Sequence, residues 1–122
     1  MARTAPRPLI AVVEDDLAVL HSLQFALEAL GYDVCAFERA AAALLSPRLK
    51  EIDCLVIDYG LPDLHGAALL SQLRVRGIRC PAIFIASNPT ARCRSDIVAA
   101  GAPLVEKPLI GDVLVDQIRS ML

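Results

Sequence analysis

Residues 52–66 read IDCLVIDYGLPDLHG, and this stretch decides the fold. Its apolar centre, residues 54–57, is short and rich in β-branched side chains, which is typical of a strand buried on both faces inside a parallel sheet. The strand ends on the charge of Asp58, and the glycines and proline that follow supply a turn before a new helix begins. Open α/β sheets bind their ligands at the carboxyl ends of their strands, so Asp58 lies at a predicted ligand site.

Strand-like and helix-like segments alternate along the rest of the chain. Strands are predicted over residues 9–13, 32–37, 54–57, 81–86 and 104–106. A helix follows each strand: one of about fifteen residues capped by Asp16, then helices over 40–45, 67–76, 90–100 and 110–121. This alternation predicts an α/β fold in which a five-stranded parallel sheet, connected by right-handed crossovers, is covered by helices on both faces.

Length and composition limit the chain to one domain. The 122 residues are 56% hydrophobic but only 4% aromatic, so the core must be built from Ala, Val, Ile and Leu. We expect the domain to cover residues 9–122. Residues 1–8, which carry two prolines and two arginines, are predicted to form a flexible N-terminal lead-in.

Charge and cysteine content exclude several classes of protein. The net charge is −2 with Lys and Arg scattered singly, so no basic stripe is present and no direct contact with nucleic acid is predicted. The apolar run at 9–13 is too short for a signal-peptide core, and we expect a cytoplasmic protein without a membrane segment. The four cysteines form no CxxC pair, which favours buried free thiols over a metal or redox site.

Charged side chains follow the first, third and fifth predicted strands. Because the carboxyl ends of parallel strands share one edge, we expect the residues at these ends to meet: Glu14, Asp15 and Asp16; Asp58; Ala86 and Ser87; and Lys107. Two carboxylates about 4 Å apart repel by roughly 4 kcal/mol at an effective dielectric constant of ~20, so such a cluster takes up a proton or binds a cation. Oxygen ligands select a hard ion, and Mg²⁺ needs few protein ligands. A metal beside a strand-end aspartate suggests phosphoryl chemistry.

Four motifs in these segments resemble the receiver domain of two-component response regulators. They read VVEDD at 12–16, LVIDYGLPDLHG at 55–66, AAGA at 99–102 and EKP at 106–108. The motifs occur in the family's order and at nearly its spacing, and the resemblance covers the chain from Leu9 onward. It implies a three-layer, CheY-like (flavodoxin-like) fold with strand order 2-1-3-4-5.

The resemblance also implies roles for individual residues. Asp58 is the phosphoacceptor. Its phosphoryl group comes from a sensor histidine kinase, a phosphotransfer protein or a small phosphodonor such as acetyl phosphate. Asp15 binds Mg²⁺ directly, Glu14 binds it through water, and the carbonyl of Gly60 is a further ligand. Lys107 pairs with the phosphoryl oxygens, and the peptide bond that follows it is cis. Such a domain is a signalling switch with self-catalysed phosphoryl transfer and autodephosphorylation, not an enzyme.

Two positions depart from the family's pattern. The usual Thr or Ser at the end of the fourth strand falls on Ala86, with Ser87 one residue later, and the usual aromatic residue of the fifth strand falls on Leu104. A hydrogen bond from a hydroxyl to a charged phosphoryl oxygen contributes about 1.5–3 kcal/mol, enough to change a two-state ratio about tenfold or more. We therefore expect phosphorylation to be retained with an unconventional readout, either through Ser87 or through altered packing of the helix at 90–100.

Other functions and partners remain open at this point. A pseudo-receiver would keep the fold as a phosphorylation-independent protein-interaction module. A metal-dependent phosphoryl enzyme is disfavoured. Haloacid-dehalogenase-type phosphatases need Asp-x-Asp after the first strand and toprim nucleases need it after a later strand, whereas here Asp58 is followed two residues later by Gly60 and the second acid is missing. The segment at 105–108 is similar to regulators with a helix-turn-helix output domain, and a second copy of the chain is another candidate partner. Three other loop residues are expected to be solvated and without a site role: Asp53, Asp63 and His65.

Overall fold

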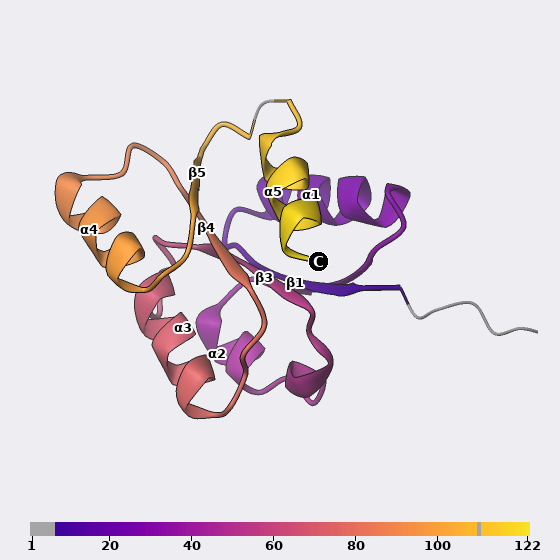
Figure 1. The fold of residues 1–122 in the computed structure, drawn as a ribbon, viewed down its shortest axis with the longest axis horizontal. Helices are drawn as coiled ribbons and strands as arrows, with labels where there is room; N and C mark the ends of the chain where they lie inside the picture. Colours follow the sequence, from indigo (N-terminus) through magenta and orange to yellow (C-terminus); the bar gives the residue numbers. More distant parts are fainter. Residues whose placement is uncertain (1–6, 110) are drawn as a thin grey trace, which may run out of the picture.

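A five-stranded parallel sheet forms the middle layer of the structure, a computed structural model that describes residues 7–109 and 111–122 (Figure 1). Its order, β2-β1-β3-β4-β5, confirms the prediction. The strands are β1 (Leu9–Val13), β2 (Asp33–Phe37), β3 (Cys54–Asp58), β4 (Ala82–Ala86) and β5 (Leu104–Glu106). The helices are α1 (Leu17–Ala29), α2 (Ala40–Leu44), α3 (Gly66–Val75), α4 (Ala91–Ala99) and α5 (Val113–Met121), with a short 3₁₀ turn η1 (Leu49–Glu51). No helix in the described ranges is long and apolar enough to cross a membrane.

Hydrophobic layers hold helices on both faces of this sheet. Figure 1 shows α1 and α5 on one face and α2, α3 and α4 on the other. Neighbouring strand residues point to opposite faces, so Val12 packs towards α1 and α5 while Val13 packs towards the other three helices. Each fully buried Val, Leu or Ile side chain contributes roughly 1.5–3 kcal/mol from removal of apolar surface from water. The buried residues of both layers are aliphatic as expected, apart from Phe84, Cys54 and Cys93.

The ends of the chain differ in part from the predicted boundaries. The last helix begins at Val113 rather than at residue 110, because Gly111 adopts a positive φ of 67° in a turn that precedes it; residue 110 itself lies outside the described residues. The lead-in prediction concerns mainly residues 1–6, which also lie outside the described residues. Arg7 is described, and its Nε donates to the carbonyl of Gly31 at 2.7 Å.

Aspartates outside the strands organise several of the connections. Asp16 caps α1 as predicted, with Oδ1 accepting from the backbone N–H of Ala18 at 3.0 Å. Asp63 is exposed, but it is more than a solvated turn residue, because it accepts from the backbone N–H groups at the start of α2, that of Ala41 at 2.9 Å. These hydrogen bonds, that of Ala41 foremost, lower the pKa of Asp63. Asp53 likewise accepts from the N–H of Leu9 at 2.8 Å and ties the start of β1 to the loop before β3.

All four cysteines carry free thiols, as predicted. Cys54 and Cys93 are buried, and Cys35 and Cys80 are half-buried. Burial raises the pKa of the Cys54 thiol to about 12, which leaves it protonated and unreactive at neutral pH.

Candidate functional site

The ladder of backbone hydrogen bonds continues one residue beyond three of the strands and places the candidate site. Glu14 N–H donates to the carbonyl of Phe37 at 2.9 Å, and Lys107 N–H donates to that of Ala86 at 2.8 Å. Tyr59 N–H donates to the carbonyl of a β4 residue, Ile85, at 2.9 Å. The residues that follow β1, β3 and β5 are therefore held at one edge of the sheet by backbone geometry alone.

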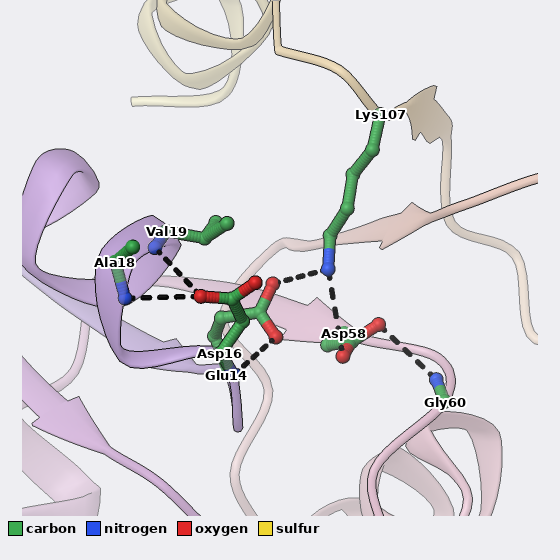
Figure 2. A network of polar contacts seen from close by, with 7 residues as sticks. All are labelled: Glu14, Asp16, Ala18, Val19, Asp58, Gly60 and Lys107. Carbon is green, nitrogen blue, oxygen red and sulfur yellow. Dashed lines mark hydrogen bonds and ion pairs between the residues drawn. The ribbon is translucent and has the colours of Figure 1, made fainter.

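Glu14 is the most deeply buried charged residue of the site, with 0% of its surface exposed. Its Oε2 accepts from the backbone N–H of Asp16 at 3.2 Å. Its Oε1 faces the ammonium of Lys107 in an ion pair, yet among the described residues no group donates a well-aligned hydrogen bond to it (Figure 2). A buried carboxylate oxygen with only this ion pair retains capacity for a further positive partner.

Lys107 reaches across the edge of the sheet and lies between two carboxylates. Figure 2 shows its ammonium directed at Glu14 and Asp58, and Nζ lies 3.6 Å from Asp58 Oδ2. Burial alone would lower the pKa of Lys107, but the ion pair with Glu14 and the negative charge of Asp58 raise it overall. The lysine is therefore a permanent positive charge beside the predicted phosphoacceptor.

Asp58 ends β3 with only 6% of its surface exposed. Its Oδ1 accepts from the backbone N–H of Gly60 at 3.2 Å. Burial raises the pKa of Asp58 to about 7, with Glu14 and Asp15 adding to the effect. Burial also opposes ionisation of Asp15, but its hydrogen bonds with Asp58 and Glu14 lower the pKa of Asp15 overall. The two pKa shifts run in opposite directions, so a proton on this pair of carboxyl groups is favoured on Asp58 over Asp15.

The carboxylates of Glu14, Asp15 and Asp58 fit a hard divalent cation. One oxygen from each lies within 4.8 Å of the others, and Asp15 is the exposed member. Three carboxylates face the single ammonium of Lys107, so the cluster is short of positive charge, and Glu14 Oε1 lacks a well-aligned donor. Oxygen donors of this kind and number suit Mg²⁺, which keeps several of its waters. The N–H of Gly60 binds Asp58, and the role of its carbonyl as a metal ligand stays a prediction.

A pocket of about 340 Å³ opens beside Asp58 and gives it access to a small ligand. The residues that line it come from the ends of β3 and β4, the start of α4 and the residue after β5: Asp58, Tyr59, Gly60, Ala86, Ser87, Asn88, Pro89, Thr90, Cys93 and Lys107. Asp58, Lys107 and both candidate positions of the strand-four hydroxyl, Ala86 and Ser87, therefore border one space.

Tyr59 extends from this pocket to α4. Its hydroxyl donates to Asp96 Oδ2 at 2.7 Å, and this hydrogen bond, with burial second, raises the pKa of Tyr59 to about 12. Its ring lies 5.7 Å from that of His65 and 6.3 Å from that of Phe84, the latter edge to face. His65 is exposed, as expected for a solvated loop residue, although its ring lies beside that of Tyr59.

Comparison with known proteins assigns the chain to a family. A family model described as "Response regulator receiver domain" matches residues 10–119. The chain belongs to this family. Among curated proteins, the receiver is 31% identical to the transcriptional regulatory protein PrrA of Mycobacterium tuberculosis, over 98% of this chain and 51% of PrrA. The chain spans about half the length of the curated relatives it matches, 51–55%.

Solved structures agree with this assignment. FixJ-N matches 94% of the receiver and 93% of its own chain, with a TM-score of 0.82 and 28% identity. A CheY-like receiver domain protein from Methanospirillum hungatei has a TM-score of 0.85 over 94% of this chain and 93% of its own; at 24% identity it supports the fold alone. The CheY-like fold implied by the sequence motifs is thereby confirmed.

Of the two departures of this receiver from the family's pattern, Ala86 lies at the pocket and Leu104 does not. Ala86 is 5% exposed and borders the pocket, so the usual hydroxyl position holds a methyl group. Ser87 is exposed, also borders the pocket, and makes no hydrogen bond to Asp58 within the described residues. Leu104 is half-buried against the cluster under α2, α3 and α4. The role predicted for Ser87 thus stays a prediction.

Sequence reasoning missed two residues of the receiver site. The position of Tyr59, directly after the strand that ends at Asp58, is the one sequence feature that could have indicated a place at the site. Its partner Asp96 lies 37 residues away, and nothing in the sequence pairs the two residues. Gly66 was assigned only to a turn. A Cβ at this position would lie 2.7 Å from the carbonyl oxygen of Asp58 and 2.8 Å from the Cα of Tyr59. Only glycine therefore lets α3 begin directly against the loop that follows Asp58.

Proposed function

We propose that this receiver is phosphorylated on Asp58 in the presence of Mg²⁺, by a sensor histidine kinase, a phosphotransfer protein or a small phosphodonor such as acetyl phosphate. The observation that carries the proposal is the convergence of three carboxylates, within 4.8 Å of one another, around a lysine whose Nζ is 3.6 Å from Asp58. An accessible pocket beside these groups gives a phosphodonor room to approach Asp58.

Asp58 acts in this proposal as the nucleophile. A carboxylate oxygen attacks phosphorus, the bond from phosphorus to the donor breaks, and the donor leaves with that electron pair, so Asp58 becomes an acyl phosphate. Lys107 neutralises charge on the phosphoryl oxygens from a position that it already occupies, so little reorganisation is needed. Mg²⁺ bound by Glu14, Asp15 and Asp58 supplies further positive charge for the transferring group.

Glu14 and Asp16 have supporting roles in this reaction. The buried Glu14 carboxylate holds the Lys107 ammonium by an ion pair, which orients the lysine while Asp58 is unmodified. The N–H of Asp16 fixes Glu14 in turn, and the Asp16 side chain caps α1. The backbone of the helix cap Asp16 therefore positions Glu14, and Glu14 positions Lys107.

The wider role that we propose is regulation of an output domain in a longer protein. Relatives such as PrrA are named transcriptional regulatory proteins and are about twice as long as this chain, which supports an output domain of the helix-turn-helix, DNA-binding kind. The receiver itself makes no nucleic-acid contact in this scheme, since its Lys and Arg residues form no basic stripe. It works in the cytoplasm as a signalling switch, with catalysis limited to its own phosphorylation and dephosphorylation.

A pseudo-receiver is the second candidate function, and Ala86 is the observation that favours it. A methyl group at the usual hydroxyl position removes one hydrogen bond to a phosphoryl oxygen. The domain would then act as an interaction module whose surface does not respond to phosphorylation.

Acetyl phosphate separates the two functions. The purified chain is incubated with Mg²⁺ and acetyl phosphate and followed by intact mass, with Asp58→Asn as the control. A receiver gains one phosphoryl group that requires both Mg²⁺ and Asp58. A well-folded sample that gains none from acetyl phosphate or from a histidine kinase refutes the proposal and leaves the interaction module.

A further inference from the structure

We propose that Tyr59 is the positioning residue that transmits phosphorylation at Asp58 to helix α4, through its hydrogen bond with Asp96. The inference rests on the proposed function, because it presumes that Asp58 accepts a phosphoryl group. It assigns the readout to the residue next to the phosphoacceptor in the chain.

Tyr59 is bonded to three elements at once. Its backbone N–H donates to Ile85 of β4 and its carbonyl accepts from Gly66 of α3, each at 2.9 Å. Its hydroxyl donates to Asp96 of α4 at 2.7 Å. Because β4 and α3 hold the backbone, a displacement at Asp58 reaches α4 through the side chain of Tyr59.

The surroundings of the ring make this side chain a stiff connection. Phe84 packs edge to face against it and is fully buried, and His65 lies on it from the loop before α3. A change of rotamer would break the hydrogen bond to Asp96 and the packing on Phe84, so the ring is held at both places. The far end of the ring is anchored to the half-buried Asp96, while the near end borders the pocket beside Asp58.

A phosphoryl group changes the charge of this pocket. It adds about −1.5 to −2 units of charge and three strong hydrogen-bond acceptors beside Asp58. Tyr59 borders the same space, and its hydroxyl is already committed to the negative Asp96. We infer that the phosphorylated loop shifts the ring, weakens the hydrogen bond to Asp96 and releases α4 from its resting position.

A second contact between α4 and the site edge is a weaker candidate for this role. Arg94 forms an ion pair with Glu106, the residue before Lys107, but both side chains are about half exposed, at 53% and 50%. Exposed ion pairs contribute little to stability because solvent screens them. Neither residue borders the pocket beside Asp58. The pair therefore serves as a matched control for loss of one α4 contact.

Substitutions on α4 test the connection without altering the pocket. Asp96→Ala removes the acceptor, Asp96→Asn retains an amide oxygen for the Tyr59 hydroxyl, and Arg94→Gln removes the control contact. Amide hydrogen exchange across residues 91–99 is measured with Mg²⁺, with and without beryllofluoride as a mimic of the phosphoryl group. Intact mass after treatment with acetyl phosphate reports modification of Asp58 separately.

We expect the Asp96 and Arg94 variants, which leave the pocket residues unchanged, to be modified on Asp58 as the unaltered chain is. Beryllofluoride speeds amide hydrogen exchange in α4 of the unaltered chain, and it does the same in the Asp96→Asn and Arg94→Gln variants. In Asp96→Ala, exchange in α4 is already about tenfold faster at rest and beryllofluoride changes it no further, as expected for loss of a charge-assisted hydrogen bond. Tyr59→Phe keeps the ring but removes the donor of the same hydrogen bond, and it is expected to give the same hydrogen-exchange result as Asp96→Ala.

Two results overturn the inference in distinguishable ways. Suppose that the unaltered chain is modified, and that Asp96→Ala and Tyr59→Phe both keep its change in α4 hydrogen exchange on adding beryllofluoride. The hydrogen bond then stabilises the fold but does not transmit the change at Asp58. If the unaltered chain is not modified at all, the proposed function fails first and the readout fails with it. Because Tyr59→Phe and Asp96→Ala change different elements, poor folding of one leaves the other as the test.

Discussion

Lys107 Nζ lies 3.6 Å from Asp58 Oδ2, while the same ammonium forms its closer ion pair with the fully buried Glu14. The lysine therefore compensates two carboxylates with one charge. Removing one partner of a buried ion pair is costly because the other charge stays out of water. The stability of the metal-free domain thus depends on the same lysine that we propose to contact the phosphoryl group.

Lys107→Met is expected to lower the free energy of unfolding by about 3 kcal/mol, because it leaves Glu14 buried beside Asp58 without a cation. Mg²⁺ should recover a large part of this loss, since a divalent cation replaces the missing positive charge. Urea unfolding with Mg²⁺ or with a chelator measures both effects. Arg119→Met, which removes an exposed pair with Asp116, is the control and should change stability little. A loss of stability in Lys107→Met that Mg²⁺ leaves untouched would argue against a cation site at Glu14.

Asp58 should make the stability of the metal-free domain fall as pH rises from about 4 to 7. Its folded pKa is raised to about 7 by burial, so the folded state holds a proton that the unfolded chain has released over this window. The loss is at most about 4 kcal/mol, from a shift of roughly three pKa units. Asp15, whose pKa is lowered, contributes stability that is present above about pH 4 and is lost only below it.

Urea unfolding between pH 4.5 and 8 in a chelator measures this slope. In Asp58→Asn no carboxyl titrates at this position, so the fall in stability with pH should disappear. If the variant keeps the slope of the unaltered chain, another group is responsible and Asp58 is ionised throughout.

Gly66→Ala is expected to destabilise the domain by about 1–3 kcal/mol, because the new methyl group overlaps the backbone of the phosphoacceptor loop. Gly60→Ala is the matched control, since its Cβ would lie 3.9 Å from Asp58 Oδ1, an ordinary contact. Thermal unfolding of the two variants compares them directly. Equal stability of the two variants would mean that α3 can withdraw from the loop at no cost.

The parts of this structure that could be predicted depend on local patterns and on the geometry of parallel sheets. Short β-branched runs locate β3 and its neighbours, and the common edge at the carboxyl ends brings Asp58 and Lys107 together without any knowledge of the loops. Strand order came from the family resemblance, since periodicity carries no information on which strands pair.

The parts that could not be predicted depend on how loops fold back. Asp63 caps a helix that begins 23 residues earlier in the chain, and Tyr59 bonds to Asp96 across the sheet edge. Such contacts depend on backbone paths that follow from packing of the whole domain. The start of α5 was placed too early because the turn at Gly111 interrupts an apolar pattern that otherwise continues.

Ala86→Thr is expected to tighten binding of beryllofluoride about tenfold, because a hydroxyl at this buried position on the pocket can donate to the charged mimic. Ala86→Val, of nearly the same shape, is the control and should gain nothing. Titration in Mg²⁺ followed by amide NMR measures both affinities, and Ser87→Ala completes the set. If Ala86→Thr gains nothing while Ser87→Ala loses affinity, the hydroxyl is already supplied by Ser87 in a shifted register. Because a β-branched residue at 86 also takes up space in the pocket, the Thr and Val variants, which have nearly the same shape, separate the chemistry of the hydroxyl from the effect of its volume.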